Sequence, residues 1–279
     1  MILLGWPGWL IVTSQISPIT FGHVANKEGF EVVKKVITHL SSGFLVLMTA
    51  APVMAQRPNL PPIPTYEVHR ARIAPQIDGR LDDAAWQAAK PVTFVFPWAD
   101  QTGKKQKTVA RLTWDNDNLY IAYACDDSDI TAIYTQHDDP TYKDDAVEIF
   151  IAPPGVKNLY LGLEMNARAV LYDYLYAFPQ RLLKKYDLPG VRLAVSRKGT
   201  LNKAGDQDQG WTLEVAIPWR SFSDLADNPV PKIGDRWIAN MNRWDGTEPN
   251  RRLSQWSDSG MLKPDPHYPD RFGQLLFAE

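Results

Sequence analysis

Short apolar segments that alternate with turn-forming sequences run through most of the chain and restrict its fold more than any other feature. In the segment 146–151 (AVEIFI), the apolar residues Val147, Ile149 and Ile151 occupy every second position. A period of two places such residues on one face of a β-strand. Strand segments that recur at this spacing, separated by turns, are typical of a β-sandwich or a jelly roll. We therefore expect an all-β fold with long loops and short helical turns.

The turns divide the sequence into a regular series of expected strands. The 22 prolines and 17 glycines supply many of these turns, and residues 115–118 (DNDN) form a clear one. The expected strands are 66–73, 92–96, 108–114, 119–125, 146–152, 160–166, 170–177, 191–197, 211–217, 237–243 and 272–277. Short helical turns are expected at 82–89, 181–186 and 219–222. Because no linker or charge run divides it, the stretch 66–279 is expected to form one domain.

The strands at 146–152 and 211–217 each carry a glutamate on the face opposite to their aliphatic residues. Glu148 shares its face with Phe150, and Glu214 lies opposite to the aliphatic stripe of its own strand. A carboxylate among apolar neighbours on the outer face of a sheet marks either a solvated surface or the floor of a binding groove. The sequence leaves both interpretations open.

The overall charge is balanced, with 30 Lys and Arg residues against 32 Asp and Glu residues. Such a chain offers no broad basic surface, so we expect no nucleic-acid partner. The single cysteine, Cys125, excludes an intramolecular disulfide and a cysteine-based metal site. Its place in an alternating segment predicts a small core residue.

The first 55 residues have the composition of an export leader. Lys34-Lys35 is a basic region, residues 36–51 are mostly apolar, and Val53-Met54-Ala55 resembles a signal-peptidase site. The apolar run is too short and too broken for a comfortable membrane span. We predict a signal peptide at about 34–55, a mature chain that begins at Gln56 without a membrane span, and a secreted or periplasmic location.

The residues before and after the predicted signal peptide need separate explanations. Signal peptides rarely begin about thirty residues before their basic region. Residues 1–33 are therefore interpreted as a gene-calling artefact, with the true start near Val32 or Val33. Residues 56–65 form a proline-rich lead, which we expect to be extended and loosely docked.

Six segments of the chain resemble, in order, the family 9 carbohydrate-binding modules and their DOMON-like relatives. They are PQIDGRLDDAAW (75–86), DNDNLYIAYACDDSDI (115–130), YKDDAVEIFIAP (142–153), GWTLEVAIPWRSF (210–222), IGDRWIANMNRWD (233–245) and RFGQLLF (271–277). The resemblance covers essentially all of 70–279. It implies a β-sandwich that binds sugars in a slot between two aromatic rings, with bound calcium in some members.

The resemblance also implies positions for the sugar slot. In the xylanase-attached modules one ring precedes the strand that matches 146–152, and Tyr142 occupies that position here. The second ring matches Trp256, and the strand glutamate of the slot matches Glu148. An arginine of those modules falls at or near Glu164, which reverses the charge. We therefore expect the hydrogen bonds to the ligand to differ.

Seven residues have the chemical types that sugar recognition requires. Flat rings stack on the apolar faces of sugars, and carboxylates and amides hydrogen-bond to the hydroxyl groups. The candidate ligand-binding residues are Tyr142, Glu148, Glu164, Asn166, Arg243, Trp244 and Trp256. By contrast, Trp86, Trp211, Trp219 and Trp237 lie in structural motifs and are expected in the core.

Acidic clusters provide the candidate metal ligands of the sequence. Residues 126–129 (DDSD), Asp138-Asp139 and Asp144-Asp145 are rich in oxygen and could bind Ca²⁺, although none has the spacing of an EF-hand. The histidines show no zinc-ligand spacing, so a zinc site is not expected. Calcium is therefore the one candidate cofactor, without assigned ligands.

Motifs for catalysis are absent from the sequence, which contains no nucleophile elbow, P-loop, dinucleotide fingerprint or H-E-x-x-H. Glu148 paired with Glu164 or Asp145 could form a glycosidase acid–base pair, but two carboxylates beside a sugar are equally expected of a binder. The sequence predicts an exported, non-catalytic carbohydrate-binding protein. Its partners would be a mono-, oligo- or polysaccharide and a separate hydrolase.

Two other functions stay open at this stage. Related sandwiches in some electron-transfer proteins hold b-type haem, which would need axial ligands such as Met165, Met241 or His137 facing a cavity. A structural role in the cell envelope would need no small ligand.

Overall fold

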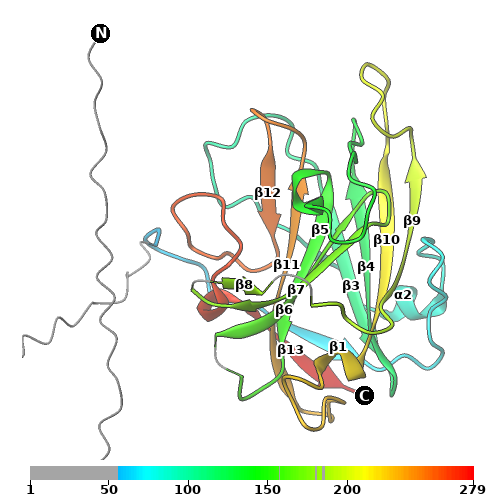
Figure 1. Ribbon diagram of the computed structural model, residues 1–279, viewed down its shortest axis with the longest axis vertical. Coiled ribbons are helices and arrows are strands. Elements are labelled where there is room, and N and C mark those ends of the chain that lie inside the picture. The colour runs from blue at the N-terminus through cyan, green and yellow to red at the C-terminus, as the bar shows by residue number, and fades with distance from the viewer. Residues whose placement is uncertain (1–55, 157, 180, 184–185) are drawn as a thin grey trace, which may run out of the picture. The chain divides into compact units, whose positions relative to one another are not determined.

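The alternation in the sequence produces two β-sheets that pack face to face. The computed structural model describes residues 56–156, 158–179, 181–183 and 186–279. Within them, an eight-stranded and a five-stranded sheet form a β-sandwich (Figure 1). The all-β fold expected from the sequence is confirmed. The predicted leader, with its signal peptide, lies outside the described residues.

The eight-stranded sheet, which we name the long sheet, has the order β1-β13-β11-β5-β6-β7-β8, and β12 pairs with β11. Its strands are β1 (Thr65–His69), β5 (Ala146–Ala152), β6 (Leu159–Asn166), β7 (Leu171–Ala177), β8 (Arg181–Leu183), β11 (Arg236–Asp245), β12 (Arg252–Gln255) and β13 (Gly273–Ala278). β1 runs parallel to β13, and the other neighbours are antiparallel.

The five-stranded sheet, which we name the short sheet, has the order β2-β3-β4-β10-β9 and is antiparallel. Its strands are β2 (Val92–Thr93), β3 (Thr108–Trp114), β4 (Asn118–Asp126), β9 (Arg192–Lys198) and β10 (Gly210–Pro218). The helical pieces are α2 (Ala84–Ala88), η1 (Thr141–Lys143), η2 (Trp219–Phe222) and η3 (Pro269–Arg271).

The core lies between the sheets and contains the aliphatic residues that the alternation predicts. Val147 and Ile149 of β5 are fully buried, as are Leu213 and Val215 of β10. Of the tryptophans expected in the core, Trp211, Trp219 and Trp237 lie between the sheets, whereas Trp86 is buried in a separate cluster on the outer face of the short sheet. Cys125 is buried as well, and burial raises the pKa of its thiol to about 12. Its predicted role as a core residue is confirmed.

Two strands of the long sheet are not predicted by the local sequence. The prediction of a helical turn at 181–186 is wrong, because β8 pairs there with β7 and places Leu182 opposite Tyr176. β12 lies in a loop-rich stretch and pairs with β11, with Ser254 opposite Arg243. Each of these short strands pairs with the strand that precedes it in the chain, and this pairing, rather than alternation within the segment itself, defines the strand.

The proline-rich lead is held against the sandwich, so the prediction that it is loosely docked is wrong. The Arg57 guanidinium pairs with Asp258 and donates to the Met261 carbonyl at 3.1 Å. Further along, the backbone N–H of Gln274 donates to the Pro64 carbonyl at 2.9 Å. Proline lacks an N–H group but keeps its carbonyl, so the lead can accept hydrogen bonds from the domain.

The glutamate on the outer face of the short sheet has a structural role. The carboxylate of Glu214 accepts hydrogen bonds from the backbone N–H groups of Asp78 at 3.0 Å and Gly79 at 2.6 Å, and from the Trp86 indole at 2.5 Å. Gly79 has a φ of +85°, and a Cβ there would lie 2.6 Å from the Val195 carbonyl carbon. Glycine is therefore required at this position. This face is neither solvated at Glu214 nor a binding groove.

Candidate functional site

The outer face of the long sheet carries a row of polar and aromatic side chains across four strands. The strand register places Asn242 of β11 opposite Glu148 of β5, Glu148 opposite Glu164 of β6, and Glu164 opposite Tyr172 of β7. Directly opposed residues share a face, with Cβ atoms about 4.5–5.5 Å apart. The two glutamates are therefore nearest neighbours across β5 and β6.

The polar side chains of this row are buried, and each has one atom without a hydrogen-bond partner among the described residues. Glu148 and Glu164 are 1% and 3% exposed, and Asn242 is fully buried. In the part of the chain that the structure describes, Glu148 Oε2, Glu164 Oε2 and Asn242 Nδ2 have no hydrogen-bond partner. The same holds, within those ranges, for Nε and Nη2 of Arg251. We name these four residues the carboxylate cluster. Spare donors and acceptors that converge in this way indicate a position for a polar ligand.

The electrostatics of the cluster favour protonated carboxyl groups. Burial raises the pKa of Glu148 to about 8, against the opposing effects of the Arg251 charge, the Asn242 amide and the Trp244 indole. Burial and the nearby Glu148 raise the pKa of Glu164 well above its ordinary value. Burial thus favours the neutral form of each carboxyl group, which offers an O–H donor together with a carbonyl acceptor.

A glycine in β6 makes room for the side chain that contacts Glu164. The Tyr174 hydroxyl of β7 donates to Glu164 Oε1 at 2.7 Å. Gly162 lies opposite Tyr174 in the ladder, and a Cβ at Gly162 would be 2.3 Å from the tyrosine ring. The absence of a side chain at Gly162 thus allows the ring to lie across β6 and reach the glutamate.

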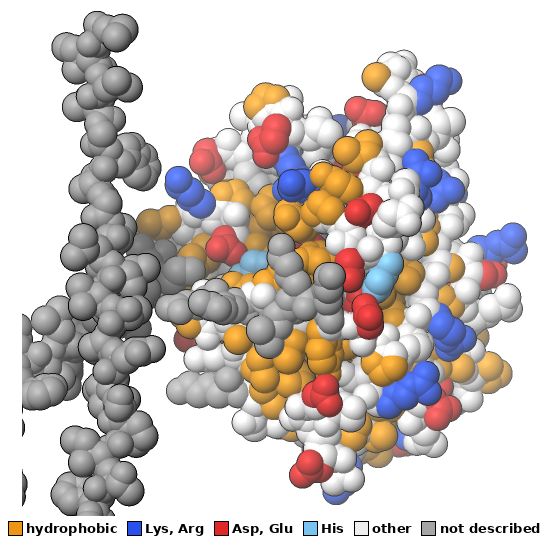
Figure 2. Space-filling view, in the orientation of Figure 1, with side chains coloured by type: hydrophobic (Ala, Val, Ile, Leu, Met, Phe, Trp, Pro, Cys, Tyr) orange, Lys and Arg blue, Asp and Glu red, His pale blue; other side chains and the backbone are white. Residues whose placement is uncertain are grey.

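A partly exposed aromatic residue lies beside each glutamate. The backbone of Tyr142, in η1, contacts Glu164, and its ring centroid is 6.1 Å from that of Tyr172, the residue opposite Glu164. Trp244, near the end of β11, lies next to Glu148, and the Arg251 guanidinium stacks on its ring at 4.1 Å. Figure 2 shows hydrophobic side chains gathered around the positions of β5, β6 and β7.

Another part of the same face is covered by the loop that carries His267. The imidazole of His267 stacks between the rings of Phe150 and Tyr176, with a centroid distance of 4.6 Å to each. The Tyr160 hydroxyl lies 2.7 Å from His267 Nδ1. Burial lowers the pKa of His267 to about 4, so the ring is neutral at physiological pH. This loop closes the aromatic end of the face and leaves the carboxylate cluster as its polar end.

The structure brings together four of the seven candidate residues from the sequence. Tyr142, Glu148, Glu164 and Trp244 gather at the carboxylate cluster. Asn166 lies on the same face of β6, but its amide donates to the Tyr134 carbonyl and to Asp144. Its side-chain oxygen accepts from two backbone N–H groups of the following turn. Asn166 therefore holds this turn, and we withdraw it from the candidate site.

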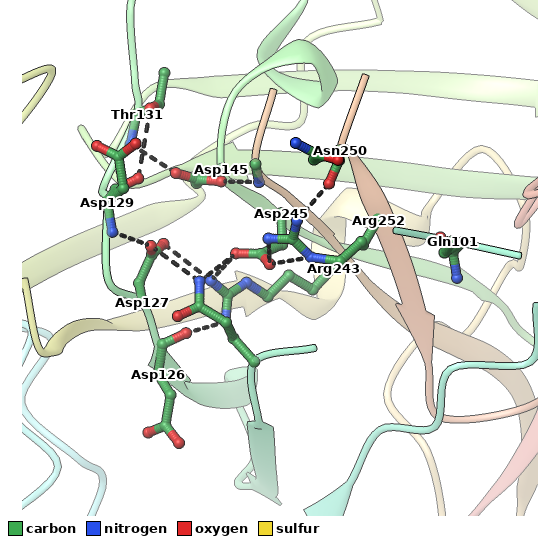
Figure 3. Close-up of polar contacts among 12 residues, drawn as sticks. Gln101, Asp126, Asp127, Asp129, Thr131, Asp145, Arg243, Asp245, Asn250 and Arg252 are labelled. Carbon is green, nitrogen blue, oxygen red and sulfur yellow. Dashed lines mark hydrogen bonds and ion pairs between the residues drawn. The ribbon is translucent and has the colours of Figure 1, made fainter. Parts of the chain in front are cut away.

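Arg243 points to the opposite side of the sheet and is also withdrawn. It is fully buried, and its Nη2 donates to Asp127 at 2.9 Å and to Asp245 at 2.7 Å (Figure 3). Its Nη1 donates to the Asp126 carbonyl at 2.8 Å. The physical reason is strand alternation, since Arg243 pairs with the core residue Val147 and not with Glu148.

Trp256 is a core residue, so the ring inferred from the resemblance does not lie at the cluster. It is 8% exposed and meets the Tyr66 ring edge to face at a centroid distance of 6.5 Å. A Cβ at Gly273 would lie 2.4 Å from its ring, which shows how closely Trp256 packs on β13. Trp244 is the aromatic residue that the structure places beside Glu148 instead.

Two members of the cluster, Asn242 and Arg251, and one neighbour, Tyr174, were not identified from the sequence. Asn242 joins Glu148 only through the pairing of β5 with β11, and Arg251 reaches the cluster from the loop before β12. Neither has a local signal. Tyr174 has one, because residues 172, 174 and 176 are all tyrosines and therefore share a face of β7.

Three buried aspartates fit an ion-pair network better than a calcium site. Asp127, Asp145 and Asp245 have carboxylate oxygens within 4.8 Å of one another. Every one of these oxygens already accepts a hydrogen bond from a backbone or side-chain N–H group, including those of Arg243 and Arg252. Ca²⁺ would have to displace these donors to gain its oxygen ligands. We therefore assign no calcium to this network.

The haem interpretation does not fit the positions of its expected ligands. Met165 and Met241 are fully buried in the core between the sheets. His137 lies at the surface, with its side chain 50% exposed. These three side chains therefore do not line one cavity that could hold a porphyrin.

Known proteins similar to this chain are carbohydrate-binding modules. The model of the carbohydrate family 9 binding domain-like family matches residues 77–278. A candidate carbohydrate-binding protein from Bacteroides uniformis ATCC 8492 superposes with a TM-score of 0.64 at 19% identity, over 77% of this chain and 100% of that one.

Two structures of a family 9 module from Caldicellulosiruptor kristjanssonii are similar as well. The complex with cellotriose gives a TM-score of 0.52 at 16% identity, over 77% of this chain and 93% of that one. The complex with glucose gives 0.51 at 16% identity, over 76% and 95%. At these identities the likeness concerns the fold.

No curated protein sequence matches the chain. Among the residues that the structure describes, no helix has the length and apolar character needed to cross a membrane.

Proposed function

The chain belongs to the carbohydrate family 9 binding domain-like family, and on this premise we propose that it binds a saccharide at the carboxylate cluster. The observation that carries the proposal is the convergence of buried polar atoms from Glu148, Glu164, Asn242 and Arg251 that, among the described residues, have no hydrogen-bond partner. Each such group costs about 1–3 kcal/mol when it is left unsatisfied. Sugar hydroxyls both donate and accept, so they match this mixed set.

Stacking on an aromatic ring supplies the second part of the recognition. Tyr142 and Trp244 are partly exposed beside the two glutamates, and either ring can lie against the apolar face of a pyranose. A stacked ring contributes about 1 kcal/mol beyond the area that it buries. Together with a few hydrogen bonds, this corresponds to an affinity in the micromolar to millimolar range.

We propose that the protein binds its ligand without cleaving it. A retaining or inverting glycosidase needs one protonated and one ionised carboxyl group. Here burial raises the pKa of Glu148 to about 8 and that of Glu164 in the same direction. Burial therefore disfavours the ionised carboxylate that would have to act as a nucleophile or a base.

The proposal also covers the identity of the ligand and the cellular location of the protein. The related modules were solved with cellotriose and with glucose, which makes glucose-based saccharides the first ligands to test. We also propose that the protein is exported after removal of the leader and that a separate hydrolase acts on the same polysaccharide. Sequencing the N-terminus of the exported protein tests the leader, and the expected first residue is Gln56.

Calorimetric titration with glucose, cellotriose and a wider panel of saccharides tests the site. Tyr142→Ala and Trp244→Ala should each weaken binding by about tenfold, which corresponds to about 1.4 kcal/mol. Glu67→Gln is the matched control, because Glu67 lies on edge strand β1 with its side chain 62% exposed. If the double variant Tyr142→Ala, Trp244→Ala binds like the wild-type chain, the site is wrong. If no saccharide binds to the wild-type chain, a structural role becomes the better explanation.

A further inference from the structure

A second cluster of charged side chains lies at a different position from the carboxylate cluster. His137 Nε2 is 3.0 Å from Asp187 Oδ1, 3.4 Å from Asp173 Oδ1 and 3.7 Å from Asp138 Oδ1. One donor atom from each of the four side chains lies within 4.8 Å of every other. The residues come from three separate segments, which are the loop before η1, strand β7 and the loop before β9.

The buried member of this cluster is Asp173, whose side chain is 1% exposed. Its Oδ2 accepts a hydrogen bond from the Leu188 N–H at 2.6 Å. Its Oδ1 has no hydrogen-bond partner within the described ranges, although it faces His137. A carboxylate oxygen that is held away from water without a donor is unfavourable unless a cation or a proton satisfies it. The orientation of Asp173 thus indicates a ligand at the centre of the cluster.

The three distances from His137 Nε2 to the carboxylate oxygens suit a tetrahedral metal ion. Bonds of about 2.0–2.1 Å from Zn²⁺ to nitrogen and oxygen place neighbouring donor atoms about 3.3–3.4 Å apart. The separations from His137 Nε2, between 3.0 and 3.7 Å, lie on both sides of this value. His137 and Asp187 also line a surface pocket of about 410 Å³, which gives an ion access from solvent.

The donor set selects a class of metal. Ca²⁺ and Mg²⁺ take oxygen ligands, whereas an imidazole nitrogen is typical of zinc and other first-row transition ions. We propose that His137, Asp138, Asp173 and Asp187 form a binding site for a divalent transition-metal ion, with Zn²⁺ as the ion to test. The sequence does not reveal this site, because only His137 and Asp138 are adjacent in the chain.

A bound ion would connect the three segments that contribute its ligands. It binds the folded chain and not the unfolded one, in which Asp173 and Asp187 are no longer held beside His137. The melting temperature of the chain should therefore rise with zinc concentration. The site is independent of the saccharide proposal, because none of its residues contributes to the carboxylate cluster.

Titration of the whole chain with Zn²⁺, in competition with a chromogenic chelator, tests the proposal. His137→Ala and Asp187→Asn should each weaken zinc binding at least tenfold, and both side chains are exposed enough, at 50% and 75%, for the fold to tolerate the change. His69→Ala is the matched control, because His69 is 53% exposed and, among the described residues, has one side-chain carboxylate nearby, that of Glu67 at 3.7 Å, while its Nδ1 lies 2.7 Å from the Glu279 backbone oxygen. It should bind zinc like the wild-type chain.

Co²⁺ provides a second readout of the same site. The wild-type chain with Co²⁺ should show the intense visible absorption of tetrahedral cobalt, and His137→Ala should not. A large excess of Ca²⁺ should leave zinc bound. The proposal is overturned if the wild-type chain binds no zinc, if His137→Ala binds it as tightly as the wild-type chain, or if Ca²⁺ displaces it.

Discussion

The clearest physical consequence of the carboxylate cluster is a loss of stability as the pH rises. The pKa of Glu148 is raised from 4.5 to about 8 in the folded protein, mainly by burial. The folded state therefore binds this proton more tightly than the unfolded chain does. The stability that the Glu148 carboxyl group contributes is fully present below pH 4.5, decreases between pH 4.5 and about pH 8, and is lost above about pH 8.

The magnitude follows from the two pKa values. Between 4.5 and about 8, the linkage changes the free energy of unfolding by about 1.4 kcal/mol per pH unit, or roughly 5 kcal/mol in total. About 3 kcal/mol of this is already lost at pH 7. Glu148→Gln keeps the size and polarity of the side chain but cannot ionise. We therefore expect the variant to be more stable than the wild-type chain by several kcal/mol at pH 8, and nearly equal to it at pH 4.5.

Urea unfolding at a series of pH values between 4.5 and 8 measures this difference directly. Carboxyl groups remote from Glu148 titrate alike in both proteins, so their contributions cancel; the pKa of Glu164, which Glu148 raises, should fall in the variant and increase the difference at high pH. Glu67→Gln serves as the control, because its side chain is 62% exposed and the change should leave the pH profile of stability unaltered. A difference between Glu148→Gln and the wild-type chain that stays constant with pH would show that Glu148 ionises normally and refute the reasoning.

Three further predictions concern side chains that the structure places in defined environments. Burial lowers the pKa of His267 from 6.5 to about 4. The stability that the neutral ring contributes is therefore present above pH 6.5 and is lost as the pH falls to about 4. In urea unfolding, His267→Phe should lose less stability than the wild-type chain between these two pH values. Arg243→Ala should destabilise the chain by about 3–5 kcal/mol, because it removes the guanidinium that pairs with both Asp127 and Asp245 and leaves Arg252 as the ion-pair partner of Asp245 alone. A change in melting temperature of only a degree would contradict this. Gly162→Ala should place a methyl group against the Tyr174 ring and cost about 1–3 kcal/mol. In calorimetry the same variant should bind saccharide more weakly, since the Tyr174 hydroxyl is moved away from its glutamate, and unchanged affinity would exclude that contact from the site.

The two outer faces of the sandwich show why a buried glutamate alone does not identify a site. Glu214 of β10 and Glu148 of β5 occupy equivalent positions in their strands, opposite to an aliphatic stripe. Glu214 accepts hydrogen bonds from two backbone N–H groups and the Trp86 indole. Glu148 Oε2 has no such donor in the described part of the chain. One glutamate is satisfied within the fold, and the other keeps a buried carboxylate oxygen without a hydrogen-bond partner among the described residues.

The sequence by itself determines the sandwich and the side of each strand that enters the core. Strand alternation is a local property with a period of two residues, so the sequence alone places Val147 in the core and Glu148 on the outer face. The same alternation over 237–243 puts Arg243 on the face of Trp237 and Met241, which is the core side. The prediction that Arg243 binds the ligand rests on its chemical type, and it is wrong because the guanidinium is buried on that side.

The tertiary structure alone decided which of these side chains meet. Asn242 joins Glu148 through the register of β5 with β11, and Arg251 approaches from a loop that no local pattern places there. His137 and Asp187 come together in the same way, from segments that are distant in the chain. The physical reason is that a strand pattern specifies which face a residue occupies, whereas its neighbours on that face depend on pairing between strands. Whether a polar group is satisfied is settled only by those neighbours.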